Sequence, residues 1–572
     1  MRARWLVALL APLLPLGLLV IGQQVSERGP DATYSNSGAG HSAPPSSGTS
    51  GPATAGAPNI LVVTMDDMRW DDLRWTPTVR REIQSRGLTF ANSFAPNPLC
   101  CPSRASFLNG QYSHHHGVLS HLSPYGFGSF DDSVTLAGRM QQAGYRTGFT
   151  GKYLNGYGYQ DSLVTRGPSQ SYVPAGWDDW RAGLQAPMEG TADFHGGTYA
   201  YFDFTQNVNG GQVENVNEYS SKVIADDTIE LTKAYHRERR PWFVWMNPVA
   251  PHHGSPFEPD DPPIQRLPDG RRMEYPTPAR PGWVKGRFDA EIRRSPGVPS
   301  GRRAAEADVS DKPRVVRRLP EEGPGERAAS LELARQRAES MYAWDREFAR
   351  VVTSLKRTGA WADTVVIFTS DNGFLLGEHR LRNGKIWSYE ESVRVPLIVA
   401  GPGVQEGRRM APATTMDVTA TVLDLAGAGA LPAMDGASLK PVLTGPDKGW
   451  TRAVVLEGYH GYYNKHDSLP ERLTVSGLRT GRWKLVHWSQ GFTELYDLKQ
   501  DPLELNNLAA MPAYRDTVNG LDQLWRSYAD CEGAACRAPL PAQWRVGVKE
   551  LAAIDAHALA ARRDYYGPLN QP

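Results

Sequence analysis

Apolar, β-branched runs recur along this 572-residue chain and alternate with stretches that have helical periodicity. The run NILVVTM is apolar at almost every position, which is typical of a strand buried on both faces of a parallel sheet. Residues 327–357 instead read as one long helix. This alternation predicts an α/β fold with a mostly parallel sheet flanked by helices. The predicted strands are residues 59–65, 145–153, 241–249, 364–370 and 395–401.

The N-terminal residues have the pattern of an export signal. Residues 1–25 combine basic Arg2 and Arg4 with an apolar run that is short and is interrupted by Pro12 and Pro15. This favours a secretory signal peptide, with an uncleaved anchor as the alternative. Residues 26–57 are rich in Gly, Ser, Ala, Pro and Thr and predict a flexible linker. We therefore expect a secreted or cell-surface protein, with membrane contact only through such an anchor.

Composition narrows the classes of partner. Hydrophobic residues make up 40% of the chain and charged residues 22%, as in ordinary globular proteins. The 62 basic and 62 acidic residues balance, so the chain has no net positive charge of the kind that would indicate nucleic-acid binding. An anionic substrate would have to be held by a local site.

Oxygen donors follow two of the predicted strands. Asp66 and Asp67 come directly after residues 59–65, and Asp371 and Asn372 follow residues 364–370. In open α/β sheets the ligand site lies beyond the carboxyl ends of the strands, so neighbouring strands would bring these groups together. Oxygen-only donors select a hard divalent cation and favour Ca²⁺ over Mg²⁺. The alternative is that these side chains cap helices or form turns.

Two of the four cysteines are adjacent, in the stretch CCPSRASFLNG from Cys100 to Gly110. This stretch resembles the sulfatase signature C-x-P-S-R-x-x-x-x-x-G, with every fixed position in order. The resemblance extends along most of the chain through GKYLN, APHH, SDNG and GKIWSYEESVRVPLIVAGPG, and through ELYDLKQDPLELNNLA near the end. The motifs CCPSRAS and GKYLN are most similar to the N-acetylglucosamine-6-sulfatase and heparan endosulfatase branch of that family.

The resemblance implies that Cys100 is oxidised to formylglycine (3-oxoalanine) by a formylglycine-generating enzyme, because it stands two residues before Pro102. The hydrated aldehyde has two hydroxyls, of which one attacks sulfur and expels the alcohol. Deprotonation of the other re-forms the aldehyde and releases sulfate, so one hard step becomes two. The hydrate would also join Asp66, Asp67, Asp371 and Asn372 at the metal. A disulfide between adjacent cysteines is disfavoured by geometry.

Other site residues are carried over from the family motifs. Arg104 would orient the hydrate and neutralise charge on the metal ligands, near a helix start that we expect at about Ser103. Lys152 and Lys385 match the two sulfate-binding lysines. His252 matches the histidine that contacts substrate and helps to protonate the leaving oxygen.

The chain departs from the common family pattern after Lys152, where many members have an aromatic residue and then a histidine. Here the run is Lys-Tyr-Leu-Asn, and Asn155 is a candidate for a hydrogen bond to the substrate. His379 is a candidate for the pocket edge. The three consecutive residues His114–His116 could not all face one ion from a helix. They are therefore expected either to contact substrate at the rim of the site or to have no direct function.

The C-terminal part predicts a second, smaller domain. ELYDL and RWKLVHW alternate at strand period, so residues 450–536 are expected to form an antiparallel sheet with a helix. Cys531 and Cys536 are spaced for a local disulfide in an exported protein. Residues 537–572 are interpreted as a tail. Residues 256–325, rich in Pro, Arg and Gly, are either a solvated surface excursion or a substrate-gripping lid.

Together these features predict an exported, calcium-dependent sulfatase of alkaline-phosphatase-like architecture, with its catalytic domain at residues 58–445. The expected substrate is a sulfated small molecule or glycan, either a 6-O-sulfated glucosamine or an aryl sulfate. Two alternatives remain: a phosphomonoesterase or phosphonate hydrolase of the same superfamily, and a non-catalytic glycan-binding surface protein. The complete set Cys100, Arg104, Lys152, His252 and Lys385 argues against the non-catalytic alternative.

Overall fold

A computed structural model describes residues 56–187, 194–299, 306–459 and 474–568, all within one compact unit. The predicted signal or anchor at residues 1–25 and almost all of the linker at residues 26–57 lie outside the described residues. Among the residues described, no helix is both long enough and apolar enough to span a membrane.

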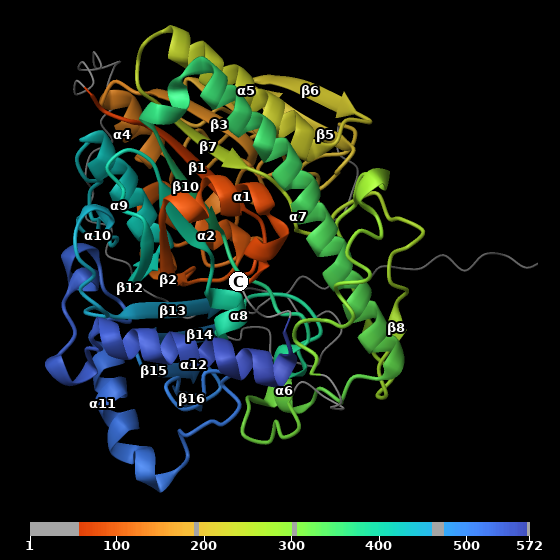
Figure 1. Cartoon of the computed structure of the whole chain (residues 1–572), viewed down its shortest axis with the longest axis vertical. Coiled ribbons are helices and arrows are strands. Elements are labelled where there is room, and N and C mark those ends of the chain that lie inside the picture. The colour runs from red at the N-terminus through yellow and green to blue at the C-terminus, as the bar shows by residue number, and fades with distance from the viewer. Residues whose placement is uncertain (1–55, 188–193, 300–305, 460–473, 569–572) are drawn as a thin grey trace, which may run out of the picture. The chain divides into compact units, whose positions relative to one another are not determined.

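A ten-stranded mixed sheet forms the centre of the fold (Figure 1). Its five central strands are all parallel, whereas antiparallel strands occur toward both edges. The predicted strand at residues 395–401 is one of the antiparallel strands. In spatial order the strands are β12 (Gly407–Thr414), β2 (Leu88–Phe94), β11 (Leu397–Ala400), β10 (Thr364–Ser370), β1 (Asn59–Met65), β7 (Trp242–Asn247), β3 (Arg146–Lys152), β4 (Asp179–Gly183), β5 (Asp203–Val208) and β6 (Gly211–Val216).

Helices cover both faces of this sheet. Successive side chains of a strand point to opposite faces, so Leu61 and Val63 of β1 pack in one core cluster and Ile60 and Val62 in another. The first cluster includes α5 (Ser220–Arg237) and α7 (Pro324–Thr358). The second includes α2 (Cys100–Asn109), α4 (Leu136–Gln142) and α9 (Thr415–Ala426). The α/β fold predicted from the sequence is therefore confirmed.

The long helix α7 has the predicted position and clear end signals. Pro324 stands in its first turn, and the Glu326 carboxylate accepts a hydrogen bond from the Gly323 amide at 2.8 Å. Gly359, at φ 82°, ends it in the left-handed conformation that favours glycine. Short helices elsewhere are α1 (Pro77–Glu82), α3 (Ser113–His116), α6 (Arg314–Arg317), α8 (Glu390–Val393) and α10 (Lys440–Thr444).

A second, four-stranded antiparallel sheet follows in sequence, as predicted. It consists of β13 (Val454–Tyr459), β14 (Thr474–Arg479), β15 (Trp483–Trp488) and β16 (Phe492–Asp497) and packs with α11 (Arg515–Arg526). Cys531 and Cys536 are joined by a disulfide. The segment interpreted as a tail instead carries the 19-residue helix α12 (Val548–Tyr566), whose Leu551 and Ile554 enter the core shared with the small sheet.

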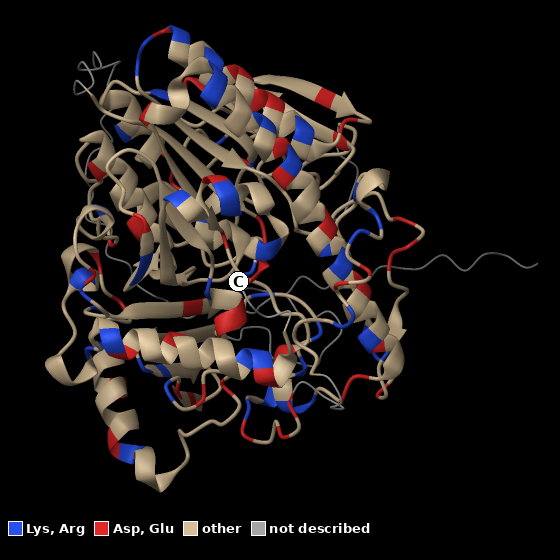
Figure 2. Cartoon of the chain, in the orientation of Figure 1, with Lys and Arg blue, Asp and Glu red and all other residues tan. Residues whose placement is uncertain are grey.

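The Pro- and Arg-rich segment between β7 and α7 is anchored at one buried arginine. Arg280 is 1% exposed and binds Glu258, Asp260 and, on α7, Glu339. A small hairpin, β8 (Gln265–Arg266) and β9 (Arg272–Met273), lies in the same segment. Figure 2 shows acidic and basic residues interspersed along the helices in view, as the balanced composition leads one to expect.

Candidate active site

The predicted oxygen donors gather at the carboxyl ends of β1 and β10. These strands are parallel neighbours with Met65 opposite Ser370, so the residues that follow them emerge side by side. The amide of Asp67 donates a hydrogen bond to Asp371 Oδ1 at 3.2 Å. Asp67 itself has φ 69°, a left-handed conformation uncommon for non-glycine residues and frequent at functional sites.

These donors have the chemistry of a cation site. The Asn372 amide nitrogen donates to Asp67 Oδ1 at 2.7 Å, while its Oδ1 is buried without a hydrogen-bond partner among the described residues. Burial and the nearby Asp66 carboxylate raise the pKa of Asp371 to about 6. Crowded buried carboxylates and an orphaned amide oxygen are the arrangement that a hard divalent cation would satisfy. The residues present therefore fit a metal ion.

Cys100 faces this group from the N-terminus of α2. The helix begins at Cys100, three residues earlier than expected, so the cysteine lies in its first turn. Its Sγ lies 3.3 Å from Asp66 Oδ1 and accepts a hydrogen bond from Lys385 Nζ at 2.8 Å. Burial and the Asp66 carboxylate raise the pKa of its thiol. Cys101 points elsewhere, with Sγ 3.8 Å from the carbonyl oxygen of Asn155.

Three buried cations balance the three carboxylates. Lys152 Nζ lies 2.6 Å from Asp66 Oδ2, and Lys385 Nζ donates to Asp67 Oδ1. Burial disfavours both ammonium charges, but the paired carboxylates raise the pKa of each lysine overall. Both lysines therefore stay charged and are placed to hold an anion.

Arg104 is the third cation. Its Nε donates to Asp371 Oδ2 at 2.8 Å, and its Nη1 donates to the carbonyl oxygen of Lys152 and to Asn247 Oδ1, each at 2.9 Å. Arg104 thus contacts both Asp371, a candidate metal ligand, and the backbone of Lys152, a candidate sulfate-binding residue. Its Nη2 is buried without a hydrogen-bond partner among the described residues.

His252 lies beside the carboxylates with a fixed ring orientation. Its Nδ1 is 2.7 Å from the carbonyl oxygen of His253, which can only accept, so Nδ1 carries the hydrogen. The ring stacks on Tyr199 with centroids 4.6 Å apart. Its Nε2 lies 3.8 Å from Asp67 Oδ2. Burial and the neighbouring His253 and Lys385 hold the pKa of His252 well below its usual value, so the ring is neutral and Nε2 is a proton acceptor.

Sequence reasoning missed several supporting residues. Asn247, at the end of β7, holds Arg104, and the strand-end rule that found the carboxylates would have found it. Tyr199 lies under Lys152 Nζ, 4.9 Å from the ring centroid, and carries no sequence signal. Arg337 of α7 donates to the Asp67 carbonyl oxygen at 2.6 Å, which fixes the backbone of that candidate ligand.

The two candidate substrate contacts differ in placement. Asn155 lies next to the site, where its amide donates to the Tyr199 hydroxyl at 2.7 Å and its Oδ1 is buried. His379, in contrast, does not lie with the carboxylates and lysines around Cys100. Its ring is fully buried, stacks on Tyr389 and binds Glu306 Oε2 at 2.8 Å, so tertiary packing holds it inside the protein.

The histidine triplet binds neighbouring elements. His114 Nδ1 is 2.8 Å from Glu457 of β13, and its Nε2 is 2.8 Å from the carbonyl oxygen of Cys531. His115 pairs with Asp435, and His116 Nε2 lies 3.0 Å from the Ser106 hydroxyl. His114 therefore connects α3 to the small sheet, and His116 connects α3 to α2. None of the three rings takes part in the group around Cys100.

The fold is a mixed α/β sheet of alkaline-phosphatase-like architecture. At its strand ends a candidate nucleophile lies among carboxylates and lysines, an arrangement suited to an enzyme that hydrolyses anionic esters. The Sulfatase family model matches residues 58–428, and the model of the C-terminal part of N-sulphoglucosamine sulphohydrolase matches residues 377–529. The chain belongs to the sulfatase family and is a sulfuric ester hydrolase. That family generally uses a divalent metal, which agrees with the acidic group described above.

Individual relatives carry different activities. The chain is 29% identical over 531 residues to an arylsulfatase of Volvox carteri, covering 86% of this chain and 76% of the relative. It is 27% identical over 526 residues to an N-acetylglucosamine-6-sulfatase of Capra hircus, covering 84% and 85%. A solved structure in complex with its substrate D-glucosamine-2-N,6-O-disulfate has a TM-score of 0.61 and 23% identity, covering 82% of this chain and 97% of that chain, which is a likeness of fold.

Proposed function

We propose that this sulfatase is an exported, calcium-dependent enzyme that hydrolyses sulfate monoesters of sugars through a formylglycine derived from Cys100. The observation that carries the proposal is the position of Cys100 Sγ, with Lys385 Nζ at 2.8 Å and Asp66 Oδ1 at 3.3 Å. An oxygen nucleophile at this position would face both the metal ligands and the cations that hold an anion.

The cysteine thiol itself is poorly suited to attack. Burial raises its pKa, so it stays protonated, and a thiol offers only one heteroatom. A hydrated aldehyde supplies one hydroxyl to attack sulfur while the S–O bond to the alcohol breaks. The second hydroxyl then loses its proton as the aldehyde re-forms and the C–O bond to sulfate breaks. Making the aldehyde requires the formylglycine-generating enzyme as a maturation partner.

The remaining residues divide the work. Lys152 and Lys385 are placed to bind the sulfate oxygens, and Arg104 holds Asp371 in place. His252, whose Nδ1 is fixed on a carbonyl, presents an Nε2 that takes up the proton lost by the attacking hydroxyl and passes it to the leaving oxygen. A Ca²⁺ ion bound by Asp66, Asp67, Asp371, Asn372 and the hydrate would supply electrostatic stabilisation of the anionic transition state.

Similarity to a relative and one aromatic side chain at the site support the proposed substrate class. The N-acetylglucosamine-6-sulfatase relative is matched over similar shares of both chains, and Tyr199, stacked on His252, offers an aromatic face beside the site. We therefore place a 6-O-sulfated glucosamine ahead of a simple aryl sulfate. A phosphonate or phosphate ester is the second candidate to be tested, because the same metal and cations would bind it.

Peptide mass spectrometry tests the nucleophile, since conversion of the Cys100 thiol to an aldehyde removes two hydrogens and one sulfur and adds one oxygen. Catalytic efficiency on matched sulfate and phosphate esters of one alcohol tests the reaction. The proposal expects the aldehyde at Cys100 and a preference for the sulfate ester. An unmodified Cys100 in fully active enzyme, or a preference for phosphate, would refute it.

A further inference from the structure

The loop segment that carries Asp371, Asn372 and Lys385 is tied to the C-terminal helix. Arg562 of α12 is 3% exposed, and its Nη1 donates to the Glu391 carboxylate of α8. Its Nη2 lies 3.8 Å from Glu378 Oε1 in that segment and 3.8 Å from Asp71 Oδ2, in the loop after β1. One guanidinium therefore joins the two loops that supply the metal ligands.

Glu391 connects this arginine to the metal ligands through the backbone. The amide of Phe374 donates to the Glu391 carbonyl oxygen at 2.8 Å. The amide of Gly373 donates to the Ser392 carbonyl oxygen, also at 2.8 Å. The approach is close, because a Cβ on Gly373 would lie 2.1 Å from the Glu391 carbonyl oxygen. A displacement of α8 would therefore displace the residues that directly follow Asn372.

The same segment sets the position of Lys385. The Leu375 amide donates to the Gly384 carbonyl oxygen at 2.7 Å, and the Ile386 amide donates to the Pro98 carbonyl oxygen at 3.0 Å. Ile386 has φ 76°, which is strained for a β-branched residue and persists only when its surroundings impose it. Lys385 thus stands on a strained backbone between the metal-ligand segment and the start of the nucleophile helix.

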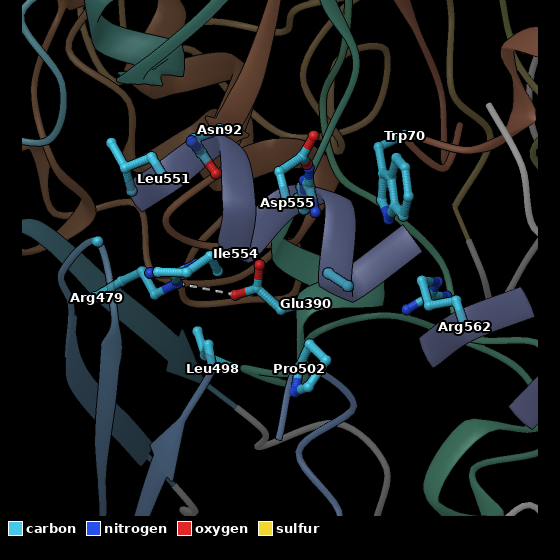
Figure 3. A pocket seen from close by; sticks show the side chains of 13 residues that line it. Trp70, Asn92, Glu390, Arg479, Leu498, Pro502, Leu551, Ile554, Asp555 and Arg562 are labelled. Atoms are coloured by element: carbon cyan, nitrogen blue, oxygen red, sulfur yellow. Dashed lines mark hydrogen bonds and ion pairs between the residues drawn. The ribbon is translucent and has the colours of Figure 1, made fainter. Parts of the chain in front are cut away.

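A second arginine supports the same geometry from the N-terminal side. Arg69 binds Asp71 at 2.8 Å, Glu378 at 2.9 Å and the Phe374 carbonyl oxygen at 2.9 Å. Arg69 holds the two loops to each other, and Arg337 of α7 contacts Asp67 and Asp72 from the first loop's side. Arg562 adds a tie from both loops to the C-terminal helix. Figure 3 shows Arg562 and Trp70 beside a small cavity of about 30 Å³, and the guanidinium lies 5.4 Å from the Trp70 ring centroid.

We infer that Arg562 is a positioning residue for the active site, through which α12 fixes Lys385 and the Asp371–Asn372 metal ligands. This inference rests on the proposed function for its catalytic meaning. Losing Arg562 would leave Glu391, Glu378 and Asp71 buried with less compensating charge, so the two loops would shift to relieve repulsion. Misplacement of catalytic groups by about 1 Å can cost on the order of a hundredfold in rate.

The test compares Arg562→Gln and Arg562→Lys with Arg563→Gln. Arg563 is the adjacent arginine, half exposed and paired only loosely with Asp564 at 3.9 Å among the described residues, so it controls for loss of one positive charge from α12. In the full-length enzyme we would measure kcat, KM, the inhibition constant of inorganic sulfate, and the Ca²⁺ dissociation constant. Active-site titration by the aldehyde content corrects for unfolded material.

For Arg562→Gln we expect kcat/KM per active site to fall by about ten- to a hundredfold, with weaker sulfate inhibition and weaker Ca²⁺ binding. Arg562→Lys should recover part of each loss, and Arg563→Gln should match the wild type. A merely structural role would reduce only the amount of folded enzyme, so unchanged constants per active site would overturn the inference. If Arg562→Gln does not fold, the inference is tested on Arg562→Lys instead, by the same three constants: kcat/KM per active site, the sulfate inhibition constant and the Ca²⁺ dissociation constant.

Failure of the proposed function would appear differently. A wild-type enzyme with no preference for sulfate esters would refute the proposed function, whereas the Ca²⁺ and sulfate binding constants of the variants would still report on Arg562. Conversely, an active wild type with indistinguishable Arg562 and Arg563 variants would refute the positioning role alone.

Discussion

Lys385 Nζ donates a hydrogen bond to Cys100 Sγ at 2.8 Å although the two residues are 285 positions apart in sequence. The same ammonium binds Asp67, a candidate metal ligand. One cation therefore contacts the proposed nucleophile and a candidate metal ligand at once. If anion binding and attack both depend on this ammonium, as proposed, substitution of Lys385 is expected to alter rate and affinity together.

The first prediction separates the two adjacent cysteines. Cys100→Ala should lower sulfate release by about a thousandfold or more, because no nucleophile would remain among the metal ligands. Cys101→Ala is the matched control, since its Sγ faces the Asn155 carbonyl oxygen and not the carboxylates. It should keep most of the activity in initial-rate assays. Similar losses from both variants would show that the nucleophile has been misassigned.

The second prediction concerns Asn372, whose amide oxygen is buried without a hydrogen-bond partner among the described residues. Asn372→Asp adds a fourth carboxylate, so divalent metal should bind more tightly while inorganic sulfate inhibits less well. Metal content by mass spectrometry and sulfate inhibition constants measure the two effects. Asn383→Asp, in the same segment with its amide on the Glu274 carbonyl oxygen, should change neither. An increase or a decrease of both the metal affinity and the sulfate affinity in Asn372→Asp would contradict this account.

The third prediction uses the leaving group to define the role of His252. A sugar alcohol leaves as a poor alkoxide, whereas a nitrophenol does not need a proton, and general acid catalysis is worth about a hundred- to ten-thousandfold. His252→Ala should therefore cripple hydrolysis of a sugar sulfate and spare much of the nitrophenyl sulfate rate. Equal losses on both substrates would make His252 a sulfate-positioning residue. Proton donation would then be sought at the adjacent His253, because His379 is buried elsewhere.

The fourth prediction is a pH dependence of stability at the junction with the small sheet. Burial disfavours the charged ring, but the hydrogen bond and charge of Glu457 raise the pKa of His114 from 6.5 to about 9. Folding thus favours the protonated ring, so this stabilisation is complete below about pH 6.5 and is lost as pH rises through 9. Its size is about 1–3 kcal/mol.

His114→Gln should remove this part of the pH dependence, as measured by thermal unfolding between pH 6 and 9.5. The control is His195→Gln, a largely exposed histidine. An unchanged decline of Tm with pH in His114→Gln would assign the pH dependence to other groups.

Local rules were enough to predict the centre of the site. The donors Asp66, Asp67, Asp371 and Asn372 follow strands that the hydrophobic pattern already identifies, and parallel neighbours end at one edge of a sheet. The resemblance to the sulfatase signature selected Cys100, because it stands two residues before Pro102. Lys152 and Lys385 came only from family resemblance. Their ion pairs join residues 86 and 318 positions apart, which no local pattern specifies.

Other side chains acquired their roles only in the tertiary structure. His379 and His114–His116 have the same chemistry as His252, yet burial against Glu306, Glu457 and Asp435 makes them structural. Residues 537–572 had no strong pattern, because α12 is stabilised by what it packs against rather than by its own sequence. The sequence by itself predicted the strands and the oxygen donors that follow them, since these depend on periodicity and spacing, whereas the choice of Cys100 as the nucleophile also needed the family resemblance. Only the folded chain decided which charges meet, because the energy of a buried ion depends on the partners that the fold brings within a few ångströms.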